Sequence, residues 1–328
     1  MSCPSTLDLT SVIKLDRVDP TFAMPFSHRV IDEKIMIAND LGDFTFLPVD
    51  DFRRFLEGDI EPRDELYAHL TQKNFIAAEV DISEQAARFA RRKHFLNQGP
   101  VLHGMVLTDR CNHGCQYCHS SVVGMSRFDT DMSIEVAEKS VDMAFQTSAL
   151  GLTIEFQGGE PTANWETLTH IVKYAQEQNL TVKKDLAFSL VTNFSIMDEE
   201  RMNWLIEHRV QVCTSLDGPE DLHNKIRRYK DGNSHALATF WIKRFNERYA
   251  EIGLDPSLYR VEALPTITRD SLSRARDIVD EYVSLGCRAL FLRKLDPYGF
   301  AAQSHKKLGY SMDDFLTFYS EALDYIIE

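Results

Sequence analysis

The sequence has no long apolar run and comparatively little positive charge. None of its apolar segments approaches the roughly 18 to 20 residues that a membrane-spanning helix needs. The 50 acidic and 36 basic residues give a formal net charge of −14 at pH 7, whereas phosphate surfaces attract proteins rich in Lys and Arg. The N-terminus lacks a basic start followed by an apolar core, so no signal peptide is expected. These absences predict a cytoplasmic protein with neither nucleic acid nor a membrane as a partner.

Cysteine is also scarce, with six residues in a chain of 328, and half of them lie in one short segment. This segment, LTDRCNHGCQYCHSS at residues 107–121, contains Cys111, Cys115 and Cys118. Thiols stay reduced in the cytoplasm, where clustered cysteines indicate a metal site or catalysis more often than disulfides. Structural zinc ligands usually come as two pairs, and no second Cys-x2-Cys or His-x3-His pair occurs in the sequence.

The sequence contains no internal repeat, and its character changes near residue 99. Residues 1–25 are expected to form a loose N-terminal tail, and residues 26–98 a small α+β domain. The elements predicted for this domain are strands within 28–40 and 42–49 and helices within 49–58, 62–72 and 82–99. The pair Gly99-Pro100 is a plausible stop for the last of these helices.

Residues 99–328 alternate between short β-rich runs and amphipathic helices. The six predicted strand–helix pairs are 101–108 with 132–147, 152–157 with 165–178, 186–192 with 198–208, 210–216 with 234–250, 259–266 with 270–285, and 288–294 with 311–327. Such alternation predicts parallel strands joined by right-handed crossovers, with helices on the outer face. Six pairs are compatible with either a partial barrel or a doubly wound sheet.

Several of these strands alternate between apolar and polar residues, although buried parallel strands are usually near-continuous apolar runs. The polar positions include Glu155, Cys213, Ser215 and Glu262. A closed eight-stranded barrel fills its interior with branched apolar side chains. A polar interior therefore favours an open barrel whose lumen holds a polar ligand, and a poorly buried sheet face is the alternative.

The cysteine cluster has the spacing Cys-x3-Cys-x2-Cys and directly follows the first predicted strand of the repeating unit. Loops at the carboxyl ends of parallel strands are where α/β folds place their chemistry. One interpretation is a zinc site with His113 or His119 as the fourth ligand. A second is three unliganded cysteines. The third is an iron–sulfur cluster with only three protein ligands, which would leave one iron open to a small molecule.

The segment EFQGGEPT, residues 155–162, ends the second predicted strand. Gly158 and Gly159 allow the backbone to approach a ligand closely, and Glu160 supplies a carboxylate beside them. A Gly-Gly-Glu sequence alone is a weak signal. At the carboxyl end of a strand next to the cysteine loop, it predicts that both motifs line the same mouth of the sheet.

The two motifs, CNHGCQYC followed by GGEP, together resemble the radical S-adenosylmethionine (SAM) superfamily. The resemblance implies an α/β fold, a partial (β/α)6 TIM-like barrel over residues 99–328 preceded by the small α+β domain. It also implies a [4Fe-4S] cluster held by Cys111, Cys115 and Cys118, whose remaining iron chelates the amino and carboxylate groups of SAM.

The same resemblance implies a set of residues that contact SAM. Gly158, Gly159 and Glu160 would bind its methionine amino group, and Tyr117 would pack against the cluster or the adenine. The remaining members of the set match segments that face the ribose and carboxylate of SAM in the family, namely Asn193, Ser215, Asp217 and Arg227. We expect His113 and His119 to be ordinary polar loop residues, with a contact to the surroundings of the cluster as the alternative.

Further segments, such as NFSIMDEE and SLDGPEDLH, are similar to peptide maturases related to anaerobic sulfatase-maturating enzymes. Within these, the sequence most resembles the His-Xaa-Ser system radical SAM maturase of the B type. The resemblance implies reductive cleavage of SAM to a 5′-deoxyadenosyl radical that modifies a ribosomally made precursor peptide. The implied partners are this peptide, a flavodoxin- or ferredoxin-type electron donor and a companion maturase.

Two expectations concern the ends of the chain. Many such maturases continue into a cysteine-rich extension with auxiliary clusters, but no cysteine follows Cys287, so a truncation before such an extension is expected. The small domain at residues 26–98 resembles peptide-recognition domains that bind a leader peptide by adding a strand, and a lid or packing role is the alternative. The alternative functions are modification of a small molecule and a non-catalytic Cys3His zinc-binding module.

Overall fold

The computed structural model describes residues 21–120 and 122–328, so the predicted tail lies mostly outside the described residues. The chain forms two compact units that divide between Gln98 and Gly99. Across the described residues, no helix is both long and apolar enough to cross a membrane.

The N-terminal unit contains an antiparallel sheet with the strand order β1-β2-β3, followed by helices. Its main elements are β1 (Ser27–Ile31), β2 (Lys34–Ala38), β3 (Phe44–Pro48), α1 (Val49–Glu57), α2 (Glu65–Gln72) and α3 (Ile82–Arg92). Alternate residues of the strands, such as Ile35 and Leu47, are buried with Phe52 and Phe55 of α1 in one hydrophobic core. The sequence predicts a single strand within 28–40, but the chain reverses there at Asp32, which has a positive φ of 53°.

The C-terminal unit is built on a parallel sheet of five strands. The strands are β4 (Leu102–Val106), β6 (Gly151–Gln157), β7 (Asp185–Thr192), β8 (Val210–Ser215) and β10 (Glu262–Leu264). Their spatial order, β10-β8-β7-β6-β4, follows the chain without reversal. A doubly wound sheet would reverse its order at a switch point. The strand order therefore selects the partial barrel, and the predicted α/β fold class is confirmed.

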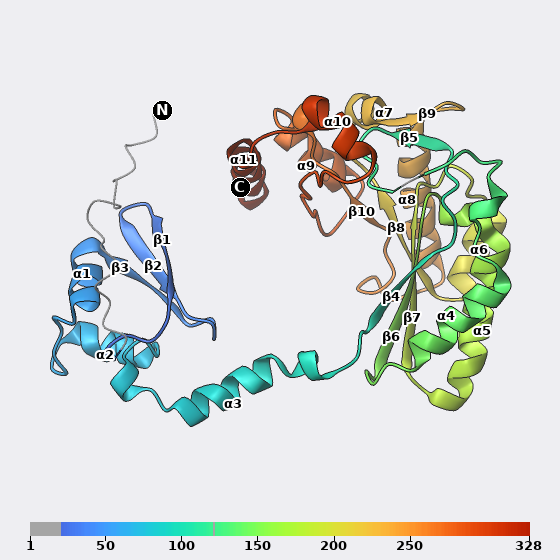
Figure 1. The fold of residues 1–328 in the computed structure, drawn as a ribbon. Helices are drawn as coiled ribbons and strands as arrows, with labels where there is room; N and C mark the ends of the chain where they lie inside the picture. The colour runs from blue at the N-terminus through green and yellow to red at the C-terminus, as the bar shows by residue number, and fades with distance from the viewer. Residues whose placement is uncertain (1–20, 121) are drawn as a thin grey trace. The chain divides into compact units, whose positions relative to one another are not determined.

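Helices cover one face of this sheet, as Figure 1 shows for α4, α5 and α6. The helices of the unit are α4 (Ile134–Phe145), α5 (Trp165–Val182), α6 (Glu199–Glu207), α7 (Glu220–Ile226), α8 (Ser234–Glu251), α9 (Ala275–Ser284), α10 (Phe300–Leu308) and α11 (Met312–Ile327). The apolar strand positions, such as Ile154 and Val212, are buried in the core with helix residues such as Ile171. The alternate positions, including Glu155 and Cys213, are only half-buried. The alternating sequence pattern thus corresponds to two sheet faces of different character.

The prediction of a sixth regular strand, at 288–294, is wrong. Only one parallel bridge forms there, between Thr266 and Arg293. Its neighbour β10 has only three residues, although the sequence predicts a strand over 259–266. A β-rich segment needs a partner of matching length to form a ladder of hydrogen bonds, and β10 does not provide one.

A short two-stranded pairing was not expected from the sequence. Strand β5 (His113–Cys115), within the cysteine segment, pairs in antiparallel register with β9 (Arg227–Tyr229). This pairing joins segments that are more than a hundred residues apart, as the 112-residue separation of Cys115 and Arg227 shows.

Truncating the fully buried Ile171 on α5 to Ala should lower the free energy of unfolding by about 2–5 kcal/mol, because it leaves a cavity beneath the sheet. The matched control is Leu180→Ala on the same helix, where the side chain is 77% exposed and the expected change is below about 0.5 kcal/mol. Chemical denaturation followed by tryptophan fluorescence measures both changes, since all three tryptophans lie in this unit. Equal losses for the two variants would contradict the assigned buried face.

Candidate functional site

A pocket of about 400 Å³ opens at the carboxyl ends of the parallel strands, on the half-buried face of the sheet. Nine of the eleven residues that the sequence assigns to the cluster and to SAM line this pocket, and the two exceptions are Glu160 and Asp217. The nine selected residues that line the pocket are Cys111, Cys115, Tyr117, Cys118, Gly158, Gly159, Asn193, Ser215 and Arg227. The structure therefore gathers residues from loops that are far apart in the sequence around one cavity.

The cysteine loop is held in place by backbone hydrogen bonds to three other segments. Cys111 N–H donates to the carbonyl of Val123 at 3.0 Å, and Gln116 N–H donates to the carbonyl of Ile226 at 3.1 Å. The carbonyl of Cys118 accepts from the N–H of Phe300 at 2.8 Å, at the start of α10. Together with the β5–β9 pairing, these bonds fix the backbone that carries the three thiols.

The two glycines bring the end of β6 into direct contact with the cysteine loop. Gly159 N–H donates to the carbonyl of Thr108 at 2.8 Å. A Cβ at Gly159 would lie only 2.4 Å from the carbonyl oxygen of Arg110, and one at Gly158 only 2.3 Å from that of Thr108. Gly158 also has a positive φ of 138°. Residues with side chains do not fit here, so the two motifs can lie side by side only because both positions are glycine.

Glu160 does not face the pocket, because its carboxylate is fully buried and bonded within the protein. One oxygen accepts from Thr192 Oγ1 at 2.7 Å and from Thr162 Oγ1 at 2.5 Å, and the other accepts from Asn193 N–H at 2.7 Å. Burial raises the pKa of Glu160, although these hydrogen bonds oppose the shift. The carboxylate thereby fixes the backbone of Asn193, whose side chain points toward Cys111 with Nδ2 3.8 Å from Sγ.

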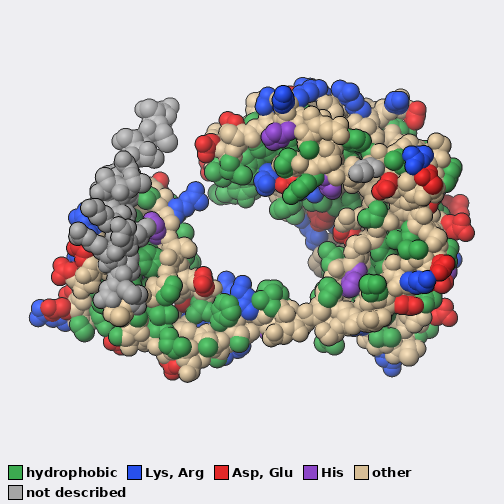
Figure 2. Space-filling view, in the orientation of Figure 1, with side chains coloured by type: hydrophobic (Ala, Val, Ile, Leu, Met, Phe, Trp, Pro, Cys, Tyr) green, Lys and Arg blue, Asp and Glu red, His purple; other side chains and the backbone are tan. Residues whose placement is uncertain are grey.

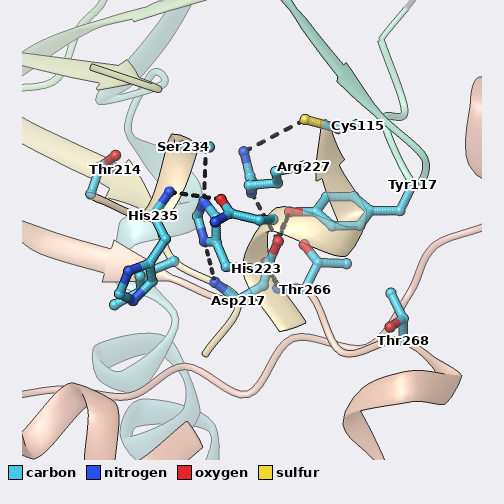
Figure 3. A network of polar contacts seen from close by, with 12 residues as sticks. Cys115, Tyr117, Thr214, Asp217, His223, Arg227, Ser234, His235, Thr266 and Thr268 are labelled. Atoms are coloured by element: carbon cyan, nitrogen blue, oxygen red, sulfur yellow. Dashed lines mark hydrogen bonds and ion pairs between the residues drawn. The ribbon is translucent and has the colours of Figure 1, made fainter. Parts of the chain in front are cut away.

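Asp217 is also fully buried and forms the centre of a polar network (Figure 3). Its carboxylate accepts from the Tyr117 hydroxyl at 2.7 Å and from Arg227 Nε at 2.9 Å. It also accepts from Thr266 N–H at 2.9 Å. Burial raises the pKa of Tyr117 well above its usual value, so the hydroxyl keeps the proton that it donates. Arg227 Nη1 in turn lies 3.9 Å from Cys115 Sγ, so the network ends at a pocket thiol.

Burial disfavours the thiolate form of two cysteines of the loop. It raises the pKa of Cys111 to about 12 and that of Cys115 to about 11, although Arg227 favours the thiolate of Cys115. A buried thiolate is costly unless a nearby positive charge compensates it. Bound metal ions would provide that positive charge, since metals bind cysteine only in its deprotonated form.

The two loop histidines differ. His119 is exposed at the pocket rim, as expected of an ordinary polar loop residue. His113 is only 5% exposed, and neither of its ring nitrogens has a hydrogen-bond partner among the described residues. Burial, with a contribution from Arg227, lowers its pKa to about 4. The sequence identifies His113 as a loop residue and a candidate zinc ligand but does not predict its burial, which follows from β5.

The wall of the pocket beyond the cysteines carries several polar side chains among apolar ones. It includes Glu155, which accepts from Ser189 Oγ at 3.1 Å, and Arg293, which donates to Thr266 Oγ1 at 3.0 Å. It also includes Cys213, whose pKa burial raises to about 12. Glu262 does not line the pocket and instead accepts from Arg288 at 3.1 Å.

The residues present fit an iron–sulfur cluster better than a single zinc ion. Within residues 21–120 and 122–328, no three His, Cys, Asp or Glu side chains converge on a position for one metal ion. A cubane cluster does not need such convergence, because each thiolate binds a different iron. The three thiols line one cavity, and the adjacent glycines keep its wall free of side chains.

Comparison with known families and curated proteins agrees with this geometry. Residues 105–287, more than half of the chain, match the family described as the Radical SAM superfamily. The radical SAM cyclopropyl synthase TigE of Paramaledivibacter caminithermalis is 24% identical over 159 residues, which are 44% of this chain and 33% of TigE. A cysteine-type anaerobic sulfatase-maturating enzyme of Clostridium novyi is 27% identical over 228 residues, 66% of this chain and 57% of that enzyme. The chain thus spans between a third and about three fifths of these relatives.

Solved structures show the same fold. The anaerobic sulfatase-maturating enzyme anSMEcpe with bound AdoMet has a TM-score of 0.55 and 22% identity, covering 68% of this chain and 59% of its own. SuiB of Streptococcus suis, bound to its precursor peptide SuiA, has a TM-score of 0.54 and 14% identity, covering 93% of this chain and 70% of its own.

Replacing Asp217 by Asn should lower the free energy of unfolding by about 3–5 kcal/mol, because it leaves the buried guanidinium of Arg227 without its counter-charge. The matched control is Asp221→Asn, which removes an exposed ion pair with Arg274 and should cost less than about 1 kcal/mol. Chemical denaturation measures both. A loss at Asp217 no larger than that at Asp221 would show that the network does not hold the loop.

Proposed function

Because the chain belongs to the radical SAM superfamily, we propose that it cleaves SAM reductively at a [4Fe-4S] cluster and modifies a ribosomally made precursor peptide. Membership of this superfamily implies both the cluster and SAM as cofactors. The single observation that carries the proposal is the pocket, where three free thiols meet the glycine pair at the carboxyl ends of the strands. When bound, the cluster supplies the electron for the cleavage of SAM, which generates the radical that activates the substrate.

We assign Cys111, Cys115 and Cys118 as the cluster ligands. Their count leaves one iron without a protein ligand, which is where SAM would bind. The three thiols are half-buried, and the nearby Arg227 would partly offset the negative charge of the Cys115 thiolate.

The SAM-binding wall divides into residues that touch the ligand and residues that hold them. The backbone of Gly158 and Gly159, with the side chains of Asn193 and Ser215, lines the pocket and would contact SAM. Glu160 and Asp217 are buried behind this wall, so we assign them as positioning residues. Glu160 acts through the backbone of Asn193.

Asp217 positions two further residues. It holds Arg227 by a buried ion pair of 2.9 Å and orients the Tyr117 ring by accepting the single hydroxyl proton, which lies within reach of both carboxylate oxygens. Arg227 thereby lies on the Cys115 side of the pocket, where it would pair with the SAM carboxylate. Tyr117, between the second and third cysteines, offers a ring face to the cluster or the adenine.

The proposal of a peptide substrate rests on relatives and on the polar side chains of the pocket wall. Relatives include sulfatase-maturating enzymes and the cyclopropyl synthase TigE, and the similarly folded SuiB binds a precursor peptide. Glu155 and Arg293 carry opposite charges that suit the polar groups of a peptide backbone or its side chains. The segments quoted above favour a substrate with His-Xaa-Ser repeats, in a system that also contains a companion maturase.

We further propose that an acidic flavodoxin- or ferredoxin-type donor docks beside the cysteine loop. Figure 2 shows Lys and Arg side chains along the top of the C-terminal unit, over α7, β9 and α10. Lys307 Nζ donates to Gln116 Oε1 at 3.0 Å, and Arg228 pairs with Gly114 in the β5–β9 ladder. A basic rim around the loop stands out in a chain with a net charge of −14 and would steer an acidic partner to the cluster.

Replacing Cys111 by Ser should abolish assembly of an intact cluster and the formation of 5′-deoxyadenosine, because one iron loses its thiolate. Anaerobic reconstitution measures this, with iron and sulfide content per chain, visible absorbance, and mass spectrometry of the products after addition of SAM and dithionite. Cys287→Ser is the matched control, since this thiol does not line the pocket, and it should retain both properties. A colourless wild-type protein that binds one zinc ion would overturn the proposed function.

The N-terminal unit is proposed to bind the peptide along β3, by addition of a strand to the sheet. Within the described residues β3 pairs only with β2, and its outer face carries Phe44 and Phe46, 53% and 43% exposed. The two rings pack edge to face at 6.1 Å, which makes an exposed aromatic surface beside the edge of β3 that no described strand occupies.

Replacing Phe46 by Asp should weaken binding of a fluorescent His-Xaa-Ser repeat peptide at least about tenfold, because an aromatic anchor is worth more than about 1.4 kcal/mol at a binding surface. Fluorescence anisotropy measures the change. Phe95→Asp is the control, with a ring that is 55% exposed but outside the sheet. Unchanged affinity in the Phe46 variant, with a wild type that binds the peptide, would favour the lid or packing role.

A further inference from the structure

His113 is a buried side chain of the pocket that the proposed mechanism does not use. It lies between Cys111 and Cys115 at the start of β5 and lines the pocket together with them. Only 5% of this residue is exposed, and neither Nδ1 nor Nε2 has a hydrogen-bond partner among the described residues. A buried polar group without a partner costs about 1–3 kcal/mol, so such a group needs an explanation.

The backbone and a neighbouring ring fix the position of this imidazole. His113 is paired with Tyr229 in the β5–β9 register, and the two rings pack with their centroids 4.9 Å apart. The backbone N–H of His113 also lies 3.4 Å from Cys111 Sγ. The ring therefore cannot reach solvent without the loss of this packing.

A second buried histidine shows that this fold can satisfy an imidazole from its own groups. His223 is fully buried, yet its Nδ1 accepts from Asp217 N–H at 3.2 Å and its Nε2 lies 2.9 Å from Ser234 Oγ. Both residues belong to the same unit and lie close to Arg227. The contrast indicates that the partner of His113 comes from what the pocket binds.

The neighbouring groups indicate that the missing partner of His113 is a hydrogen-bond acceptor. Arg227, the charged residue that acts on His113, has only donors and cannot accept from the imidazole. An imidazole carries at least one N–H in every protonation state at physiological pH, so it can always donate one hydrogen bond. The acceptors that the pocket would hold beside Cys111 and Cys115 are the sulfur atoms of an iron–sulfur cluster.

We propose that one ring N–H of His113 donates a hydrogen bond to a sulfur atom of the bound [4Fe-4S] cluster and thereby raises its reduction potential. This inference rests on the proposed function, because it requires the cluster to be held by the three cysteines. Hydrogen bonds to the sulfurs stabilise the more negative, reduced cluster, which is a recognised determinant of cluster potential. His113 would thus adjust how readily the cluster accepts the electron that it passes to SAM.

The test is an EPR-monitored redox titration of the anaerobically reconstituted protein without SAM. His113→Phe keeps an aromatic ring against Tyr229 but removes the N–H. This variant should lower the equilibrium constant for reduction of the cluster roughly tenfold. For one electron, that change is a shift of about 59 mV to lower potential. His113→Asn or His113→Gln places an amide N–H near the position of Nδ1 or Nε2, so one of the two should restore the potential. His170→Phe, on the outer helix α5, is the matched control and should not move it.

A second measurement separates a hydrogen bond from direct ligation and does not depend on the variants. Pulsed EPR of wild-type protein with ¹⁵N-labelled histidine should show a weak nitrogen coupling to the reduced cluster. No coupling, or the strong coupling of a coordinated nitrogen, would overturn the inference. An unchanged potential in His113→Phe at full cluster content would overturn it as well, as would a shift that arises only with SAM present. If the wild-type protein assembles no cluster, the proposed function itself fails.

Discussion

The buried ion pair between Asp217 and Arg227 is the interaction on which the rest of the pocket depends. A carboxylate with no exposed surface must be compensated, and here the compensation comes from segments that are distant in the sequence. Tyr117 belongs to the cysteine loop, Arg227 to β9, and Thr266 follows β10. One carboxylate therefore ties the loop to both β8 and the open end of the sheet.

The glycine pair provides a second constraint, of a steric kind. Gly158 and Gly159 allow β6 to touch the backbone of residues 108–110 without intervening side chains. The ion pair fixes the part of the cysteine loop that carries Tyr117. The glycines fix the other part, at residues 108–110. The pocket between them is fixed by the fold before any ligand is present, as an efficient cofactor site requires.

Much of this architecture could be predicted from the sequence, because the signals are local. The alternation of strands and helices, the polar strand face, and the two motifs follow from residue spacing within short windows. The strand at 288–294 was predicted wrongly because its formation depends on the length of its neighbour β10. The hairpin at Asp32 lacks the Asn-Gly or Asp-Gly pair that marks most tight turns.

The features that escaped prediction all depend on non-local contacts. The β5–β9 pairing gives no signal in either segment, yet it buries His113 and brings Arg227 to Cys115. The carboxylates of Glu160 and Asp217 were expected to face the ligand, but the structure places their hydrogen-bond partners within the protein. Motif spacing identifies residues near a site and does not give the direction of each side chain.

During synthesis of the protein, the β5–β9 pairing can form only well after the cysteines have been made. Cys115 and Arg227 are separated by 112 residues, so at about 5–20 residues per second the ribosome needs roughly 6–22 s to make the second after the first. During that interval the thiols have emerged without the strand that orients them. Insertion of a cluster into its final surroundings must therefore follow the completion of β9.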